Sequence, residues 1–277
     1  MKIALIGLPQ AGKKTLFSLL TGRGVPEVRK PGETVEGVAH IRDARIDTVS
    51  EMCQTRSKVY AENHFVLCPD AVTGENSRGW LDAACRCDLL CLVVRAFASD
   101  QVYHPDGSVD GARDEENLKS ELLFADMEMV EKHNKKKNAD EQILPLFSKK
   151  PIMVILNVGE DQLSECEALE NKYADELGVE RSQVVAICAK VEEELSELSG
   201  EERSEYLAEL GVTDSGLVRL ISKAYETLGL MSYLTAGEKE VRAWTIPVGI
   251  TAPKAAGVIH TDFTKKFIKA KICNYDD

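Results

Sequence analysis

Short runs of apolar residues recur along the chain and alternate with longer stretches in which apolar residues recur at helical spacing. The continuous apolar runs are residues 2–7, 64–68, 89–94, 151–156 and 183–188. The amphipathic stretches are residues 115–132, 161–177 and 214–228. Continuous apolar strands that alternate with helices are typical of a parallel sheet covered on both faces. The pattern therefore predicts an α/β fold with a mostly parallel sheet, whose ligands bind beyond the carboxyl ends of the strands.

Two stretches break this alternation. Residues 133–142, HNKKKNADEQ, are polar and charged, which predicts an exposed linker or hairpin tip. After Leu230, VRAWTIPVGI predicts a strand, and TAPKAAGVIH predicts a short helix that Thr251 caps and that carries Pro253 in its first turn. We therefore expect a main domain over residues 1–230 and a small β-rich module over residues 231–277.

The composition bears on the compartment. No stretch reaches 18 apolar residues, so the sequence predicts no transmembrane helix and no membrane partner. The start, MKIALIGLPQ, predicts a buried first strand instead of a signal peptide. The eight cysteines form no C-x-x-C pair and no zinc-type spacing with the five histidines, which predicts reduced thiols in a cytoplasmic protein. A cluster role for Cys85, Cys87 and Cys91 is the minor alternative.

The net charge of −12 argues against a whole surface that binds nucleic acid, because neutralising phosphates requires clustered cations. The charge is uneven, since residues 232–277 hold seven Lys or Arg and five Asp or Glu. Four lysines lie close together there, and they are Lys265, Lys266, Lys269 and Lys271. They predict either a contact with RNA or a strand edge guarded by lysines. The acidic run over residues 192–209 predicts a solvated helix face.

The first predicted strand runs directly into GLPQAGKKTLF at residues 7–17, which matches G-x-x-x-x-G-K. A predicted helix follows and ends at Gly22, so backbone N–H groups and a helix N-terminus point at one place where an anion can bind. Lys13 would contact the terminal phosphates of a nucleotide and Thr15 the inner ones. The alternative is an ordinary glycine turn. The predicted phosphate-binding residues are Gly7, Gln10, Ala11, Gly12, Lys13, Lys14 and Thr15.

Lys14 occupies the position where a Ser or Thr hydroxyl would ligate magnesium. An ammonium cannot ligate a cation, but it can donate hydrogen bonds to phosphate oxygens beside Lys13. We therefore expect ATP or GTP as the ligand, an affinity that depends little on Mg2+, and slow hydrolysis.

The later apolar runs are followed, in order, by residues that a nucleotide site needs. Asp70 stands after the run at 64–68, where an Asp that orients magnesium through water belongs. Base-reading residues belong after the run at 151–156, and a loop resembling S-A-K follows the run at 183–188. Each of these alone is equally a surface loop, but together they predict a nucleotide site. The predicted base-binding residues are Asn157, Val158, Glu160, Cys188, Ala189 and Lys190.

Over nearly its whole length the chain resembles the YchF-type, Obg-related P-loop ATPases of the TRAFAC class. GLPQAGKKTLF resembles the family's GLPNVGKSTLF, and CDLLCLVVRAF at 87–97 resembles D-A-I-V-H-V-V-R-x-F. SELLFADMEMVEK at 120–132 resembles the helix T-E-L-x-L-A-D-L-E-x-V-E-K. Residues 236–270 are similar to the start of the family's TGS-type C-terminal domain. The resemblance implies the P-loop NTPase fold with a partial TGS-like module, and association with the ribosome.

The resemblance also implies ATP over GTP. GTPases read guanine with N-K-x-D, whereas here Glu160 is one methylene longer than Asp and Val158 replaces the Lys. A site that lacks hydrogen bonds to guanine loses much of its preference for that base. The family replaces the usual water-positioning Gln by a His in the loop after a later strand, and His104 falls at that place. The alternative for His104 is a loop histidine in solvent.

Several segments depart from the family pattern. Its D-x-x-G motif reads DAVT at residues 70–73, so Thr73 replaces the Gly whose N–H meets the γ-phosphate, unless Gly74 serves instead. The family's long helical hairpin is reduced to a short insertion near residues 115–148. The loop after Gly22 is trimmed, and the TGS-like module stops about half-way.

We therefore expect a weak P-loop ATPase in which Lys13 and His104 act in catalysis. The alternatives are a non-hydrolysing, nucleotide-dependent regulatory paralogue and a structural module that binds no nucleotide. The sequence leaves the oligomeric state open.

Overall fold

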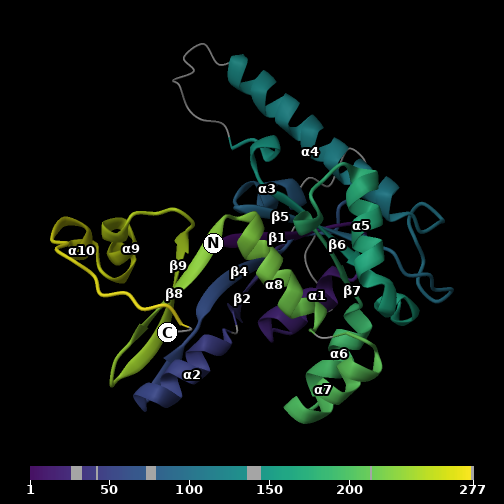
Figure 1. The fold of residues 1–277 in the computed structure, drawn as a ribbon. Helices are drawn as coiled ribbons and strands as arrows, with labels where there is room; N and C mark the ends of the chain where they lie inside the picture. Colours follow the sequence, from purple (N-terminus) through teal and green to yellow (C-terminus); the bar gives the residue numbers. More distant parts are fainter. Residues whose placement is uncertain (26–32, 42, 73–78, 136–144, 213, 276–277) are drawn as a thin grey trace. The chain divides into compact units, whose positions relative to one another are not determined.

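The computed structural model describes residues 1–25, 33–41, 43–72, 79–135, 145–212 and 214–275 (Figure 1). The chain forms two compact units. The larger unit contains residues 1–39 and 63–227, and the smaller contains residues 40–62 and 228–277. The smaller unit therefore includes residues 40–62, which the sequence analysis placed with the main domain. Division into domains at residue 230 stays a prediction.

The larger unit is built on a six-stranded sheet with the strand order β2-β4-β1-β5-β6-β7 (Figure 1). The pairs β4–β1, β1–β5, β5–β6 and β6–β7 are parallel. The five apolar runs of the sequence form five of these strands, as predicted. The bounds are β1 Lys2–Ile6, β2 Val35–Ile41, β4 Ala61–Leu67, β5 Leu89–Arg95, β6 Ile152–Asn157 and β7 Val184–Ile187.

Helices cover both faces of this sheet. Ala4 and Ile6 of β1 belong to a core that also contains residues of α3, α4 and α5. Ile3 and Leu5 point to the opposite face and are also completely buried. Helix α1 contacts β1, and α8 contacts β7. Because side chains alternate along a strand, burial of both sets requires cover on both faces.

The predicted amphipathic stretches form helices, and 161–177 begins as a 3-10 helix before it continues as α5. Residues 133–135 close α4, and the rest of the polar stretch 133–142 lies outside the described residues. No helix among the described residues is long and apolar enough to cross a membrane. The bounds are α1 Lys13–Thr21, α3 Gly79–Cys85, α4 Gly111–Asn134, α5 Cys166–Leu177, α6 Ala189–Glu197, α7 Gly200–Glu209, α8 Gly216–Thr227, η1 Phe147–Lys149, η2 Glu160–Glu165 and η3 Arg181–Gln183.

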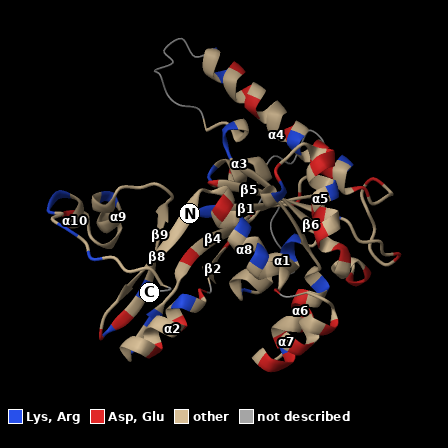
Figure 2. Cartoon of the chain, in the orientation of Figure 1, with Lys and Arg blue, Asp and Glu red and all other residues tan. Residues whose placement is uncertain are grey.

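The acidic run at 192–209 forms α6 and α7, whose acidic residues are coloured red on the ribbon in Figure 2. The prediction of a solvated face was wrong for Glu192, which is 6% exposed. Its carboxylate accepts the N–H of Gly216 at the start of α8. Burial raises the pKa of Glu192, although hydrogen bonds from the start of α8 oppose this shift. This side chain therefore ties α6 to α8.

A three-stranded sheet with the order β3-β9-β8 forms the centre of the smaller unit. Strands β8 and β9 are antiparallel, β3 is parallel to β9, and Ile46 of α2 packs with Val241 and Ala243 of β9. The strand predicted from VRAWTIPVGI is β9, as expected. The bounds are α2 Ala44–Cys53, β3 Ser57–Val59, β8 Leu230–Ala236 and β9 Glu240–Pro247.

Two short helices, α9 Ala252–Ile259 and α10 Thr261–Lys265, follow this sheet. Pro253 stands in the first turn of α9, as predicted, but the side chain of Thr251 accepts no capping hydrogen bond. Thr251 is nevertheless the N-cap residue of α9, at the position that was predicted. The four C-terminal lysines are exposed, and those after Lys265 lie in irregular chain, so they do not guard a strand edge.

Candidate functional site

The loops that follow β1, β4, β5, β6 and β7 line one cavity of about 720 Å3. A cavity of this volume has the size of ordinary small-molecule and cofactor sites. It therefore brings together the phosphate-binding, Asp70 and base-binding segments that the sequence analysis singled out. Its walls are residues 9–15, Asp70, residues 97–99, 101 and 102, residues 157–161, residues 188–190 and Glu193.

Two glycines shape the loop between β1 and α1. Gly12 has a φ of 95°, and a Cβ there would lie 2.2 Å from Nδ2 of Asn157. A Cβ on Gly7 would lie 2.3 Å from the carbonyl oxygen of Val93 in β5. Gln10 also adopts a positive φ, of 64°, which is strained for a side chain of its size. The loop therefore requires Gly at both motif positions. Gly7 is required by its close packing against β5, and it does not line the cavity.

Lys13 is held inside this loop. Its ammonium donates to the carbonyl oxygens of Gly7 and Leu8, each at 2.7 Å, and to Oδ1 of Asp70 at 2.8 Å. The side chain of Lys13 is 3% exposed, whereas that of Asp70 is 40% exposed. Asp70 therefore acts in this structure as the counter-ion of the loop lysine.

Lys14 and Thr15 lie in the first turn of α1 and both line the cavity. Lys14 is exposed, and it makes no ion pair with any residue that the structure describes. Its ammonium is therefore available to a ligand in the cavity.

The residues of this loop do not fit a directly ligated magnesium ion, which prefers oxygen ligands in octahedral geometry. The residue after Lys13 offers an ammonium, and the carboxylate of Asp70 is bonded to Lys13. Orientation of magnesium by Asp70 stays a prediction. Thr73 and Gly74, which bear on contacts to a γ-phosphate, lie outside the described residues.

Asn157 at the end of β6 joins two loops of the site. Its Nδ2 donates to the carbonyl oxygen of Ala11 at 3.0 Å, and its Oδ1 accepts the N–H of Ala189 at 3.1 Å. The side chain is buried, with 4% exposure. Asn157 therefore fixes the phosphate-binding loop against the loop after β7.

Besides Ala189, whose N–H binds Asn157, the other base-binding candidates are two buried and two exposed residues. Val158 and Cys188 are 1% and 3% exposed, and burial raises the pKa of the Cys188 thiol. Glu160 and Lys190 are exposed and form an ion pair of 3.2 Å across the end of the cavity. The hydrogen bond to Glu160 raises the pKa of Lys190. The exposed pair therefore presents both a hydrogen-bond acceptor and a donor.

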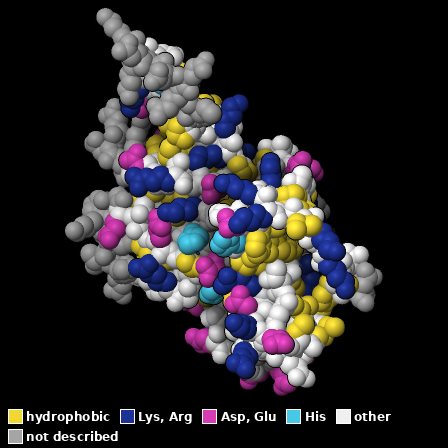
Figure 3. Space-filling model, turned by 90° about the vertical axis from the view of Figure 1, so that its left-hand side faces the viewer, with side chains coloured by type: hydrophobic (Ala, Val, Ile, Leu, Met, Phe, Trp, Pro, Cys, Tyr) yellow, Lys and Arg dark blue, Asp and Glu magenta, His cyan; other side chains and the backbone are white. Residues whose placement is uncertain are grey.

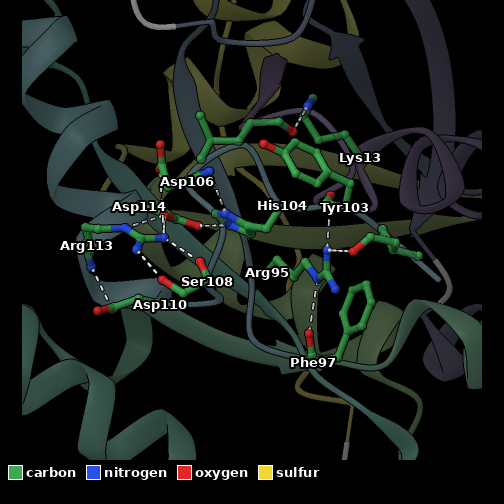
Figure 4. A network of polar contacts seen from close by, with 12 residues as sticks. Lys13, Arg95, Phe97, Tyr103, His104, Asp106, Ser108, Asp110, Arg113 and Asp114 are labelled. Atoms are coloured by element: carbon green, nitrogen blue, oxygen red, sulfur yellow. Dashed lines mark hydrogen bonds and ion pairs between the residues drawn. The ribbon is translucent and has the colours of Figure 1, made fainter. Parts of the chain in front are cut away.

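The loop after β5 is held by Arg95, as Figure 4 shows. Its guanidinium donates to the carbonyl oxygens of Phe97, Ser99 and Val102, and it lies 4.5 Å from the centre of the Phe97 ring. Burial lowers the pKa of Arg95. Since residues 97–99, 101 and 102 line the cavity, Arg95 sets the shape of one of its walls. This residue was not predicted from the sequence, although a charge at the end of a seven-residue buried strand is a usable signal.

His104 lies further along the same loop and is not among the residues that line the cavity. It is 6% exposed, so the alternative of a solvent histidine was wrong. Its Nε2 lies 2.8 Å from Oδ2 of Asp114, and its Nδ1 accepts the N–H of Asp106 (Figure 4). Arg113 donates to the other oxygen of Asp114. One ring nitrogen is thus bonded to α4 and the other to the backbone of the loop, and water positioning by His104 stays a prediction.

The parallel sheet, the glycine-shaped loop and the buried lysine at the start of α1 define a P-loop nucleotide-binding protein. Over 99% of its length the chain is 35% identical to "Ribosome-binding ATPase YchF" of Bacillus subtilis, of which it covers 88%. It is also 35% identical to the protein of the same name from Escherichia coli O157:H7, of which it covers 89%. The chain belongs to the YchF family.

Two further comparisons agree. Residues 230–277 match the family model YchF-GTPase_C, described as "Protein of unknown function (DUF933)". The fold is similar to that of the Schizosaccharomyces pombe YchF GTPase, with a TM-score of 0.76 and 27% identity over 97% of this chain and 86% of that one. The alignment with the Bacillus subtilis relative spans 324 positions against 277 residues here, so that relative carries residues at positions where this chain has none.

Proposed function

We propose that this chain binds ATP in the cavity and hydrolyses it slowly. The observation that carries the proposal is the single cavity of about 720 Å3 in which the phosphate-binding loop, Asp70 and the loops after β6 and β7 meet. Relatives that are named ribosome-binding ATPases support it. Phosphates would lie over the loop backbone and the N-terminus of α1, where backbone N–H groups and the helix dipole favour an anion.

The residues at the base end favour adenine. Val158 leaves no ammonium stem to lie along the base, and Glu160 is longer than the Asp that reads guanine. The Glu160–Lys190 pair presents an acceptor and a donor, which match the amino group and the ring nitrogen on the Watson–Crick edge of adenine. Asn157 would act mainly by holding the two loops in place.

Slow hydrolysis follows from the groups that surround the phosphates. Positioning and electrostatic stabilisation do most of the work in phosphoryl transfer. Lys13 would stabilise charge on the terminal phosphates, but Lys14 offers no ligand to a metal, and His104 is bonded to Asp114. For His104 to orient a water, the loop after β5 must first release it from this carboxylate.

We further propose that the protein is cytoplasmic and associates with the ribosome through its C-terminal lysines. The names of the relatives support the partner, and eight free cysteines fit a reducing compartment. All four lysines are exposed. On the face drawn in Figure 3, Lys and Arg side chains lie among acidic and apolar ones, so an RNA contact would be local.

The choice of base is tested by calorimetry with ATP and GTP on the wild-type protein and on a double variant, Val158→Lys with Glu160→Asp. We expect ATP to bind the wild-type protein at least as tightly as GTP, and the double variant to shift toward GTP. A wild-type protein that binds GTP about tenfold tighter than ATP, a gap of about 1.4 kcal/mol, would contradict the adenine assignment.

Hydrolysis is tested separately, in a single-turnover assay with radiolabelled ATP and protein in excess. A slow but measurable release of phosphate that Lys13→Ala abolishes is the expected result. Binding without any release of phosphate would instead favour a regulator that reads the bound nucleotide.

A further inference from the structure

The ammonium of Lys13 is paired with an anion that the protein itself supplies. The ammonium donates to two backbone carbonyls at 2.7 Å and to the carboxylate of Asp70 at 2.8 Å. The carbonyls belong to the rigid loop after β1, whereas the side chain of Asp70 is 40% exposed. Of the two partners in the ion pair, Asp70 is therefore the one that can move into water.

A phosphate that reaches Lys13 must take the place of one of these acceptors. Hydrogen bonds between an ammonium and an anionic oxygen are stronger than those to a neutral carbonyl, so phosphate and carboxylate compete for the same donor. Asp70 then opposes phosphate binding for as long as it stays on Lys13. This competition is the reverse of the role of a magnesium-orienting Asp, which helps the nucleotide to bind.

Lys14 adds a second positive charge beside Lys13. It lines the cavity, is exposed and has no ion-pair partner among the described residues. An ammonium there repels a divalent cation and offers it no oxygen ligand. Together the two ammonium groups carry the charge that one magnesium ion would bring to the phosphates.

We propose that this site binds an oligophosphate without a divalent cation, with Lys13 and Lys14 as paired cations and Asp70 as an internal anion that the phosphate displaces. The proposal rests on the proposed function only in placing a nucleotide in this cavity. Because the base takes no part in it, inorganic triphosphate is a ligand of the same site.

The experiment is calorimetry with two ligands, inorganic triphosphate and ATP, each in EDTA and in magnesium. Two variants, Asp70→Asn and Lys14→Ser, should change the affinity for triphosphate in EDTA in opposite directions. Asp82→Asn in α3 and Lys172→Ser in α5 make the same charge changes at exposed sites away from the cavity, and they serve as matched controls.

We expect wild-type affinity for triphosphate to be the same within about threefold in EDTA and in magnesium. Asp70→Asn should bind it about tenfold tighter in EDTA, because a neutral amide does not hold Lys13 as a carboxylate does. Lys14→Ser should bind about tenfold more weakly in EDTA and regain affinity with magnesium, since it restores a hydroxyl at that position. Both controls should match the wild-type protein.

Wild-type binding that requires magnesium, or weaker binding of Asp70→Asn in magnesium without a gain in EDTA, would overturn the proposal. Should Asp70→Asn not fold, Lys14→Ser still tests the binding without a divalent cation. The side chain of Lys14 is exposed, so its replacement leaves the fold intact. Binding of triphosphate in EDTA without binding of ATP would leave this inference standing and remove the proposed function. Binding of ATP only with magnesium would overturn this inference and leave the proposed function standing.

Discussion

His104 and Asp114 are joined by a buried hydrogen bond of 2.8 Å between Nε2 and Oδ2. Because Nδ1 of His104 accepts the N–H of Asp106, Nε2 is the ring nitrogen that donates a proton to Asp114. Both side chains are less than a tenth exposed. The pair thus ties the loop after β5, which lines the cavity, to the first turn of α4.

Loss of this pair should loosen the loop. Replacing Asp114 by Ala leaves the buried Nε2–H of His104 without its acceptor, so we expect the free energy of unfolding to fall by about 1–3 kcal/mol. Urea unfolding measures this change, with Glu116→Ala on the exposed side of the same helix as the control. A loss no larger than that of the control would show that the pair does not hold the loop.

If His104 also orients the attacking water, the same Asp114→Ala variant should change single-turnover hydrolysis. A released imidazole should raise the rate of phosphate release, and the double variant with His104→Ala should lose the gain. An unchanged rate in Asp114→Ala would assign His104 to the structure of the loop alone.

The parts of the fold that follow from local pattern could be predicted from the sequence. Five buried parallel strands are indicated by continuous apolar runs in the sequence. The loop at residues 7–12 carries the glycines that its close packing requires. The order of the loops along one sheet edge then places the phosphate-binding and base-binding segments together.

The parts that depend on contacts between distant residues could not be predicted in this way. Strand β3 has only three residues and is defined by its pairing with β9, far along the chain. In the sequence Glu192 cannot be distinguished from the other acidic residues of its run. Only the structure shows that its carboxylate accepts the N–H of Gly216. Likewise, nothing near Asp70 in the sequence indicates that its carboxylate meets Lys13.

The close approach at Gly12 gives a prediction about stability. Gly12→Ala places a methyl group 2.2 Å from Nδ2 of Asn157 at a residue whose φ is 95°. Gly22→Ala also has a positive φ, of 63°, but meets nothing within 4 Å, so it isolates the backbone strain of about 1–2 kcal/mol. We expect Gly12→Ala to lower the free energy of unfolding more than Gly22→Ala does, and to remove nucleotide binding. Equal losses in urea unfolding would contradict the close packing of Gly12 against Asn157.

Buried Glu192 gives a prediction about pH. Burial raises its pKa above the ordinary value of 4.5, so the folded protein holds this proton more tightly than the unfolded chain does. Its contribution to stability is therefore present below pH 4.5 and is lost as the pH rises through the folded-state pKa. In Glu192→Gln the amide oxygen can still accept the N–H of Gly216 and carries no charge.

Unfolding in urea at pH 4 and pH 7 tests this sign. The stability of Glu192→Gln relative to the wild-type protein should rise between the two values, whereas Glu197→Gln, at an exposed site of the same helix, should show no such rise. A constant difference between Glu192→Gln and the wild-type protein would mean that Glu192 ionises as easily as an exposed side chain.

The C-terminal lysines give a prediction about the partner. If they contact ribosomal RNA, changing Lys265, Lys266, Lys269 and Lys271 to Glu should weaken co-sedimentation with ribosomes and flatten its dependence on salt, by up to about 0.7–0.9 in slope for each lost phosphate contact. The control is reversal of the charge, by substitution with Glu, at three exposed lysines of α4, its C-terminal end and α5, which are Lys132, Lys135 and Lys172. Unchanged co-sedimentation of the C-terminal variant would remove the RNA role from this segment.

Binding of a nucleoside triphosphate in the cavity beside Lys13 is tested most directly by the melting temperature with and without ATP. A ligand that binds only the folded state adds about 2.7 kcal/mol of stability at a hundred times its Kd. We predict that ATP raises the melting temperature of the wild-type protein and leaves that of Lys13→Ala unchanged. A wild-type protein whose melting temperature responds to none of ATP, ADP, GTP and GDP would contradict the claim.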